Sequence, residues 1–393
     1  MSSVEIKKSY EEINQKIKKG KAVIVTADQM PSIVKSEGVK KAFEKIDVVT
    51  TGTFGIMCSS GAFLNFGHTK PRMRATKVYL NDVEAYAGIA AVDCYIGATQ
   101  VKEDDPLNKV HPGSFKYGGG HVIEDLIAGR HVKVKLHSYG TDCYPLKEYE
   151  KTITINDLRN ALLYNPRNAY QNYNTAINCS KKIIYTYMGI LKPDMANITY
   201  SGAGQLSPLL NDPYYWTIGT GTKIFLGGAV GAVTWHGTQH APDGKRDENG
   251  MVMEGSGTIA VCGNMREMNT DFIRGASITG YGCSLMVGIG IPIPILNEDL
   301  AYFTGLSDKD IKTPIIDYGI DYPNGEPNVL KEVTFAELKS GSVELKGLSI
   351  PASPLSSYPK ALEIAGILKG WIENGFTIGV PQIQMPTVPF NKK

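Results

Sequence analysis

Glycine dominates the stretch from Tyr200 to Pro294, and this feature restricts the folds open to the chain more than any other. Glycine weakens helix interiors, and it permits tight turns and close approaches between backbones. We therefore expect short strands and turns in this region rather than long helices. The glycine clusters are Ser201-Gly-Ala-Gly204, Gly219-Thr-Gly221, Gly227-Gly228, Gly280-Tyr-Gly282 and Gly288-Ile-Gly290.

The N-terminal part alternates between helix and strand signals. A capping box, Ser9-Tyr-Glu-Glu12, starts a helix that is predicted to end at Lys19. A buried strand over Ala22–Thr26, a helix over Ser36–Lys45 and a strand over Val48–Thr51 follow. Strand, helix and strand in this order predict a parallel crossover unit, and residues 77–81 and 88–96 continue the pattern. We expect parallel crossover units in the N-terminal half. The fold class is therefore α/β, with a mixed α+β arrangement as the alternative.

Local patterns predict the later elements. Residues 131–137 alternate between polar and apolar and form the clearest strand, and residues 152–155 and 157–163 read as a strand followed by a helix capped by Asn156. A helix-like segment follows Pro294. A hairpin-like stretch over 332–348 and a short C-terminal helix over 358–374 come after it.

Composition and charge exclude several classes of protein. A formal charge of +2 gives no reason to expect nucleic acid or an anionic membrane as a partner. The longest apolar run, Ile224–Trp235, is shorter than the roughly 18–20 residues that cross a bilayer. We expect a cytoplasmic protein with one catalytic unit over residues 1–370, a subdivision near 146–156 and a proline-rich tail over 371–393. The oligomeric state, a homo-oligomer included, stays open.

The spacing of the cysteines excludes some kinds of cysteine site. The nearest two of the six cysteines, Cys262 and Cys283, are 21 positions apart, which excludes CxxC redox motifs and zinc ribbons. Cys58 and Cys143 each follow a strand that ends in a glycine-containing turn, where exposed N–H groups stabilise a thiolate. These two are therefore candidate reactive thiols. Cys94, Cys179 and Cys262 read as small buried hydrophobes, and Cys283 is undecided.

Other motifs point away from bound cofactors. Gly219-Thr-Gly221 does not extend to a dinucleotide-binding fingerprint, and no Walker lysine motif is present. His236 and His240 share the spacing of a helical zinc pair, but Gly237 and Thr238 between them favour a polar loop. Gly118-Gly-Gly-His121 fits an anion-binding helix start and a flexible hinge equally well. We expect no metal and no cofactor bound by the chain.

Polar side chains near the two thiols complete the candidate site. His68 lowers the pKa of Cys58 if its loop folds back, and His137 ends the strand before Cys143, so both are candidates for thiolate support. Arginine is scarce, with eight residues. Arg266 and Arg274 are proposed to bind a substrate carboxylate, although pattern alone does not separate them from Arg72, Arg74 and Arg167.

Several segments resemble one family. The chain is similar to the homocysteine-biosynthesis family of methanogenic archaea and other anaerobes, the L-aspartate semialdehyde sulfurtransferases, through about residue 370. The cysteine-bearing segments are the most specific. The resemblance rests on Ala22–Ala27, Asp47–Gly55, Met57–His68, Leu80–Gly88 and Tyr139–Pro145.

The resemblance implies an activity and two functional residues. It implies conversion of L-aspartate semialdehyde and sulfide to homocysteine, with the two functional cysteines of the family at Cys58 and Cys143. It also implies a small ferredoxin as external electron donor. Some relatives carry paired CBS domains, and we expect none here because the chain ends too early for them.

Electron counting agrees with an external donor. Exchange of an aldehyde oxygen for sulfur leaves carbon at the thioaldehyde level, and two more electrons are needed to reach a thiol. Our hypothesis is that a persulfide on Cys143 attacks the aldehyde, Cys58 resolves the resulting disulfide and ferredoxin restores the dithiol. Two alternatives are a cofactor-independent thiol enzyme acting on another aldehyde and a non-catalytic sulfur carrier that docks ferredoxin.

Overall fold

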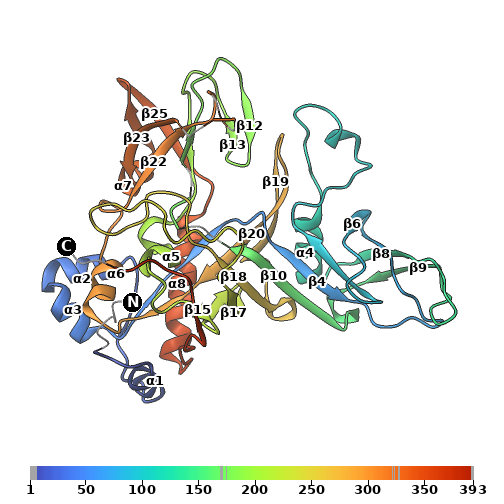
Figure 1. Cartoon of the computed structure of the whole chain (residues 1–393), viewed down its shortest axis with the longest axis horizontal. Coiled ribbons are helices and arrows are strands. Elements are labelled where there is room, and N and C mark those ends of the chain that lie inside the picture. Colours follow the sequence, from blue (N-terminus) through green and yellow to red (C-terminus); the bar gives the residue numbers. More distant parts are fainter. Residues whose placement is uncertain are drawn as a thin grey trace.

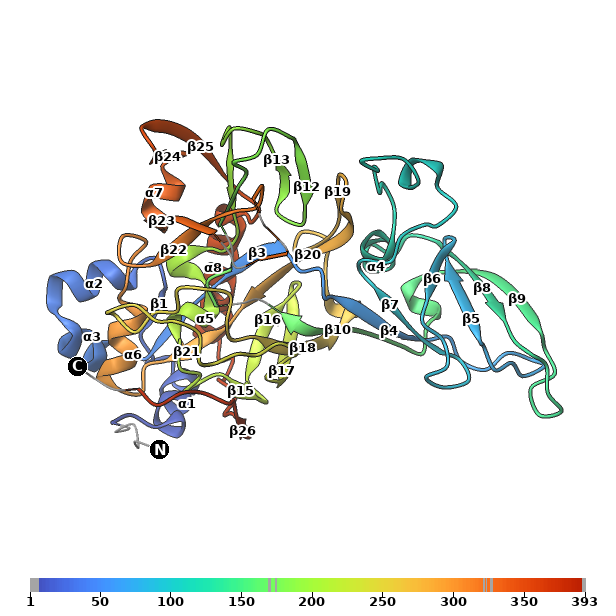
Figure 2. The same cartoon turned by 45° about the horizontal axis from the view of Figure 1, so that its top comes forward.

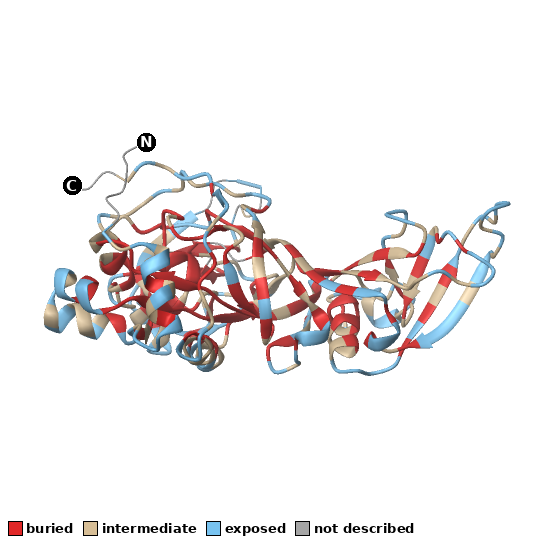
Figure 3. Cartoon of the chain, turned by 90° about the horizontal axis from the view of Figure 1, so that it is seen from below, coloured by how far each residue is buried: buried red, intermediate tan, exposed pale blue. Residues whose placement is uncertain are grey.

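The structure is a computed structural model that describes residues 7–168, 171–173, 175–320, 322, 324–325 and 328–390. A larger body holds both ends of the chain, and an arm extends from it with α4 and β4 to β9 (Figure 1). Figure 2 shows the same division from a second direction. Buried residues concentrate in the body and continue along the strands that lead into the arm (Figure 3). The arm is therefore joined to the body by packed strands.

The N-terminal segment contains one parallel crossover unit as predicted, whereas the strands over residues 77–80 and 93–97 pair antiparallel and do not continue the pattern. Helix α1 (Tyr10–Lys18) starts at the predicted capping box, with the Ser9 and Glu12 side chains each bonded to the other residue's backbone. Strands β1 (Ile24–Thr26) and β2 (Val48–Thr50) are parallel, and β21 (Pro292–Pro294) pairs antiparallel with β2. The prediction of a single helix over 36–45 is wrong. Helices α2 (Met30–Glu37) and α3 (Val39–Lys45) meet at Gly38, whose φ of 85° breaks the helix.

The central sheet spans body and arm, and its strand pairs are antiparallel. The glycine-rich stretch forms most of it, so the expected strands and turns are confirmed there. Its order is β19 (Ile273–Ile278), β20 (Gly282–Gly290), β16 (Lys223–Leu226), β17 (Ala229–Trp235), β18 (Ile259–Asn264), β10 (Asn160–Asn168), β4 (Gly61–Asn65) and β7 (Asp93–Gly97), with β3 (Thr53–Ile56) also on β20.

Strand β10 replaces a predicted helix. A helix over 157–163 is wrong, because only a short 3₁₀ turn, η2 (Ile155–Asp157), precedes the strand. Side chains at 161, 163 and 165 are buried and those at 160 and 162 are exposed, which is the two-residue period of a strand. Pairing with β4 on one edge and β18 on the other stabilises the extended form over any local preference for helix.

The arm carries a sheet in the order β6-β5-β8-β9. The predicted strand over 131–137 is confirmed as β8, with Val132, Val134 and Leu136 buried. Helix α4 lies between this sheet and the β19–β20 hairpin (Figure 2). The elements of the arm are β5 (Lys77–Leu80), β6 (Val83–Ala85), η1 (Pro106–Asn108), α4 (Gly119–Ile127), β8 (Val132–His137) and β9 (Glu148–Ile153).

A third sheet forms the upper part of the body in Figure 1. Its order is β23 (Asn328–Thr334), β22 (Lys312–Asp317), β11 (Thr175–Ile177), β14 (Ile198–Tyr200), β25 (Leu348–Pro354) and β24 (Ser342–Leu345). The hairpin expected over 332–348 is shifted to β24 and β25. A capping box between Thr334 and Glu337 starts the short helix α7 (Phe335–Lys339) before it.

Smaller elements complete the body. The helix-like segment expected after Pro294 is confirmed as α6. The described part of the tail packs on the body, where Phe390 lies 5.0 Å from the Tyr214 ring centroid. Residues 391–393 of the predicted tail lie outside the described range. The remaining elements are β12 (Ile184–Thr186), β13 (Gly189–Leu191), η3 (Gly204–Leu206), α5 (Pro208–Asn211), β15 (Gly219–Thr220), η4 (Met265–Glu267), α6 (Glu298–Thr304) and β26 (Ile383–Gln384), the last paired with β15.

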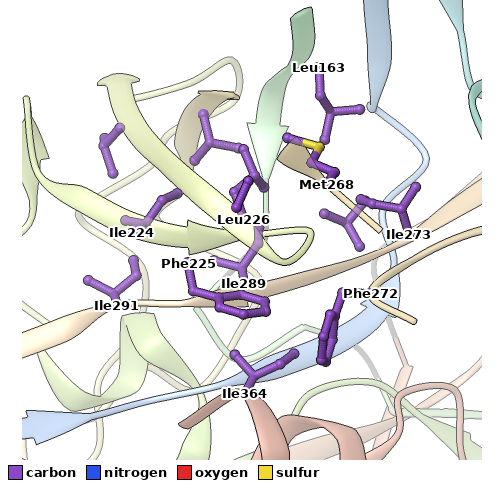
Figure 4. Packing of buried hydrophobic residues seen from close by; sticks show 14 of the residues in the cluster. Leu163, Ile224, Phe225, Leu226, Met268, Phe272, Ile273, Ile289, Ile291 and Ile364 are labelled. Carbon is purple, nitrogen blue, oxygen red and sulfur yellow. The ribbon is translucent and has the colours of Figure 1, made fainter. Parts of the chain in front are cut away.

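The predicted C-terminal helix is confirmed as α8 (Tyr358–Glu373), and it covers the central sheet. Its approach requires a residue without a side chain at Gly52, where a Cβ atom would lie 2.0 Å from the Ala361 carbonyl oxygen. Figure 4 shows Ile364 of α8 facing Phe225 and Phe272, whose rings meet edge to face at 5.0 Å. Among the described residues, no helix combines the length and apolar character that crossing a bilayer requires.

Candidate active site

The principal cavity of the described structure has a volume of about 860 Å³ and lies between the central sheet and the third sheet. One wall comes from the turn after β3, from the end of β10 and from the β19–β20 hairpin. These elements contribute Cys58, Arg167 and Tyr281. Tyr187 and Met188 also line the cavity. A concave site of this size with a few convergent polar groups is typical of small-molecule binding.

The register between β3 and β20 places Cys58 in this wall. Ile56 pairs with Met286 in the antiparallel ladder, and the Met57 amide donates to the Leu285 carbonyl at 2.8 Å. Two residues beyond Ile56, Cys58 therefore meets Ser284, whose hydroxyl donates to the Cys58 sulfur at 3.2 Å. Ser284 is fully buried. The thiol is thus held at a fixed point by a strand far away in the sequence.

Tyr281 lines the cavity together with Cys58, and the two groups interact electrostatically. The Tyr281 ring meets that of Tyr187 edge to face, with ring centroids 6.0 Å apart. Burial raises the pKa of Tyr281 to about 12, and the neighbouring Cys58 adds to this rise while Arg167 opposes it. The phenol therefore keeps its proton at neutral pH.

The two serines after Cys58 fix the rest of the turn. The Arg167 guanidinium donates through Nε to the Ser59 hydroxyl at 3.2 Å, and the Asn165 amide donates to the Ser60 hydroxyl at 3.1 Å. The other guanidinium N–H groups have no partner among the described residues. Arg167 lines the cavity, so these donors are available to an anionic ligand.

Cys143 lies in a different environment. It is exposed, in the turn between β8 and β9 at the end of the arm sheet, and its sulfur is 3.7 Å from the Thr141 hydroxyl. The next residue, Tyr144, stacks on His68 with ring centroids 6.4 Å apart. This thiol is open to solvent.

The structure does not bring the two candidate thiols together. Cys58 precedes β4, whereas Cys143 belongs to a turn that contacts His68, beyond the other end of β4. Five residues of strand span about 13 Å at the usual rise. Cys143 is not among the residues that line the cavity.

The other candidate residues also lie away from the cavity lining. His68 is beside the Cys143 turn rather than beside Cys58, and Nδ1 of His137 is 3.8 Å from a Glu148 carboxylate oxygen. Arg266 donates to the backbone carbonyls of residues 158 and 159, and Arg274 donates to that of residue 270 at 3.2 Å. None of the four lines the cavity.

The remaining cysteines are free and away from the cavity lining. Cys94 is buried, as predicted, and burial raises its pKa. Cys179 and Cys262 are half-buried, and burial raises the pKa of both. Cys283, which was undecided, is buried with its pKa raised to about 11, and its thiol donates to the Phe115 carbonyl at 3.3 Å. Burial therefore disfavours the thiolate of these four.

The histidine pair and the glycine run that were considered as metal or anion sites have structural roles. His240 contacts the Thr258 carbonyl at 3.0 Å and the Pro386 carbonyl at 2.8 Å, so both of its ring nitrogens are engaged. Gly119 and Gly120 start α4 where Cβ atoms would lie 1.8 Å and 1.9 Å from backbone oxygens of β7 and β20. These glycines permit close packing. In the described part of the chain, no group of three His, Cys, Asp or Glu side chains is arranged to hold a metal ion.

Tyr281 and Ser284 were missed by the sequence reasoning, which noted the glycines and the cysteine of Gly280-Tyr-Gly-Cys-Ser284 but not its two hydroxyl groups. The available signal was a tyrosine between glycines in a stretch of hairpins. Asn165 was missed because it follows a segment, residues 157–163, that was predicted as a helix rather than as part of a strand.

Comparison with known proteins identifies relatives over nearly the whole chain. The model of a family described as "Homocysteine biosynthesis enzyme, sulfur-incorporation" matches residues 22–378. A Methanosarcina acetivorans protein named L-aspartate semialdehyde sulfurtransferase is 50% identical over 377 residues, which are 96% of this chain and 71% of that protein. A Methanocaldococcus jannaschii protein of the same name is 47% identical over 383 residues, 94% of this chain and 71% of that protein. No solved structure matches significantly.

Proposed function

The chain belongs to the homocysteine biosynthesis family of sulfur-incorporating enzymes, and we propose that it makes L-homocysteine from L-aspartate semialdehyde and sulfide. Two relatives that are 47–50% identical carry the name of this activity, and each match covers at least 94% of the chain. The observation that carries the proposal is the position of Cys58, held in the wall of the main cavity beside Arg167.

The reaction balances with an external reductant. One aldehyde, one hydrogen sulfide, two electrons and two protons give one thiol and one water. The chain has no nucleotide fingerprint that would indicate a bound hydride donor. We therefore assign the electrons to a separate one-electron carrier, a small ferredoxin.

We assign the carbon–sulfur bond to the cavity. Cys58 carries the reacting sulfur as a persulfide, because it is the candidate thiol that a substrate in the cavity would meet. Hydrosulfide attacks the Cys143 sulfur of a Cys58–Cys143 disulfide, which is the two-electron oxidant of this step, and the outer sulfur then passes to Cys58. The disulfide re-forms when Cys143 displaces the product sulfur from Cys58. Arg167 binds the substrate carboxylate through the guanidinium N–H groups that have no partner among the described residues. Arg266 and Arg274 have backbone partners instead, so the cavity favours Arg167 for this role.

Cys143 is assigned to sulfur delivery. An exposed thiol in a turn is accessible to sulfide donors and to a reductant protein. Transfer from Cys143 to Cys58 requires that the β8–β9 turn of the same chain or of a second copy reach the cavity, since disulfide exchange needs Cα atoms within about 7 Å. This assignment exchanges the roles of the sequence-based hypothesis, in which Cys143 carried the attacking sulfur.

The test is turnover with L-aspartate semialdehyde, sulfide and a low-potential reductant. Cys58→Ser and Cys143→Ser should each abolish homocysteine formation, and Cys262→Ser, which changes a half-buried cysteine of β18, should not. Mass spectrometry of the enzyme in its Cys58–Cys143 disulfide form after sulfide treatment should find one added sulfur on the Cys58 or Cys143 peptide, because hydrosulfide cleaves the disulfide into one persulfide and one thiol. Full activity in both single variants would reject the site, and absence of turnover in the wild-type chain would reject the activity.

A further inference from the structure

The β19–β20 hairpin contributes two hydroxyl side chains near one thiol. Tyr281 lies in its turn and Ser284 lies on β20, three residues later. The Ser284 hydroxyl donates to the Cys58 sulfur, and Tyr281 lines the cavity together with Cys58. The register Ile278 to Gly282 and Ala276 to Ser284 is regular along the hairpin. Both side chains therefore come from a single rigid element.

The hairpin turn is fixed in a way that orients Tyr281. Gly280 adopts a φ of 75°, a conformation that favours glycine, and its amide donates to the Gly113 carbonyl at 2.9 Å. A Cβ atom at Gly280 would lie 2.4 Å from the Tyr185 side chain. On the other strand of the hairpin, the start of α4 packs against the Ser284 backbone, where a Cβ atom at Gly120 would lie 1.9 Å from its carbonyl oxygen. Neither hydroxyl depends on a loose loop.

The two hydroxyls differ in access. Ser284 is fully buried and has no contact with the open cavity, whereas the Tyr281 side chain lines the cavity and the residue is 42% exposed. A buried donor can hold a thiol in place but cannot exchange its proton with water. A donor at the cavity surface can do both.

We propose that Tyr281 is the proton donor to the aldehyde oxygen as sulfur adds to the carbon, and that Ser284 is a positioning residue that holds Cys58. This inference rests on the proposed function. The proposed function makes the substrate an aldehyde. Tyr281 and Cys58 lie in one wall of the cavity, so the oxygen of a carbonyl group attacked at Cys58 lies within reach of the neighbouring phenol.

The step balances without a redox change. A lone pair of the sulfur carried by Cys58 forms the carbon–sulfur bond, and the π pair of the carbonyl moves to its oxygen. That oxygen takes the phenolic proton of Tyr281, which leaves a tyrosinate. Water then returns a proton to the exposed tyrosinate. The raised pKa of Tyr281, caused mainly by burial, keeps the donor protonated at neutral pH before each cycle.

The test of Tyr281 separates proton donation from a structural role. Tyr281→Phe keeps the ring and should lower kcat about 100-fold with KM changed less than about twofold. Tyr185→Phe is the matched control, because its ring packs on the same turn and it does not line the cavity. Incorporation of 3,5-difluorotyrosine at position 281 lowers the phenol pKa and should change kcat, which a packing role would not do.

The test of Ser284 uses alkylation of Cys58 and needs no substrate. Iodoacetamide labelling of the Cys58 peptide at one fixed pH, followed by mass spectrometry, should differ in rate by at least about threefold in Ser284→Ala, because the hydroxyl that holds the sulfur is lost. Ser277→Ala is the control on the neighbouring strand, where the hydroxyl faces His121 at 3.3 Å.

The outcomes are distinguishable from failure of the proposed function. If the wild-type chain makes homocysteine and Tyr281→Phe keeps its kcat, the proton-donor role is overturned while the function stands. If the wild-type chain makes no homocysteine, the function fails and the Tyr281 role fails with it. An unchanged alkylation rate of Cys58 in folded Ser284→Ala overturns the positioning role in either case.

Discussion

The two candidate thiols occupy contrasting surroundings. Cys58 is half-buried at the cavity, with polar side chains from β10 and β20 bonded to it and to the next two residues. Cys143 is exposed in the β8–β9 turn, where its described contact is a 3.7 Å approach to the Thr141 hydroxyl. One thiol is positioned and the other is accessible. Formation of the carbon–sulfur bond requires a positioned thiol, and delivery of sulfur by a separate donor requires an accessible one.

The largest expected effect separates these two roles directly. Cys58→Ser and Cys143→Ser should each lose at least about 1000-fold of the sulfide-dependent rate, because each removes a nucleophile. A small soluble persulfide should then restore turnover in Cys143→Ser and not in Cys58→Ser, since it replaces delivery but not the cavity thiol. Homocysteine is measured by derivatisation and mass spectrometry. Rescue of Cys58→Ser instead would reverse the assignment.

A second prediction concerns the cation of the cavity. Arg167→Met should raise KM for L-aspartate semialdehyde about 30-fold, because a charge-assisted hydrogen bond to a carboxylate is removed. Arg274→Met is the control, as its guanidinium donates to a backbone carbonyl outside the cavity lining. Initial rates against substrate concentration measure both. An unchanged KM in the Arg167 variant would place the carboxylate elsewhere in the cavity.

Local sequence patterns predicted the accessible region better than the positioned one. The alternation of polar and apolar residues in β8 predicts the end of this strand, and with it the Cys143 turn, correctly. A strand with one buried face can be recognised from a pattern of about seven residues. The contact between Cys58 and Ser284 joins residues 226 positions apart, and it follows from the register of β3 on β20. The spacing of polar and apolar residues within one segment cannot predict which distant strand that segment pairs with.

The predicted helix over 157–163 failed for the same reason. The segment became β10 because β4 and β18 pair with both of its edges, and this strand places Asn165 and Arg167 at the Cys58 turn. Helix α1, whose capping box forms as predicted, was predicted correctly, whereas the cap expected at Asn156 did not produce a helix. The site therefore depends on the long-range pairs that the sequence did not reveal.

A third prediction compares how much the side-chain hydrogen bonds of the Cys58 turn and of the Cys143 turn contribute to the free energy of unfolding. Asn165→Ala should reduce the free energy of unfolding by about 1–3 kcal/mol, since its fully buried amide donates to the Ser60 hydroxyl and the loss leaves that oxygen without its donor. Thr141→Val in the exposed turn should change it by less than about 0.5 kcal/mol. Urea unfolding gives both values, and equal losses would contradict the distinction between a held turn and a free one.

The smallest expected effect tests accessibility itself. Iodoacetamide is small enough to reach both thiols. A maleimide on a long polyethylene glycol chain should label Cys143 about tenfold faster than Cys58, because Cys58 lies in the cavity wall and Cys143 is exposed. Peptide mass spectrometry reads the two sites in the same sample. The comparison uses the ratio of the two reagents at each cysteine, so differences in thiol pKa cancel. Slow labelling of Cys143 by the large reagent alone would mean that the turn is covered in solution. The accessible thiol would then face a protein surface, and sulfur would pass to Cys58 inside an assembly rather than from free donors.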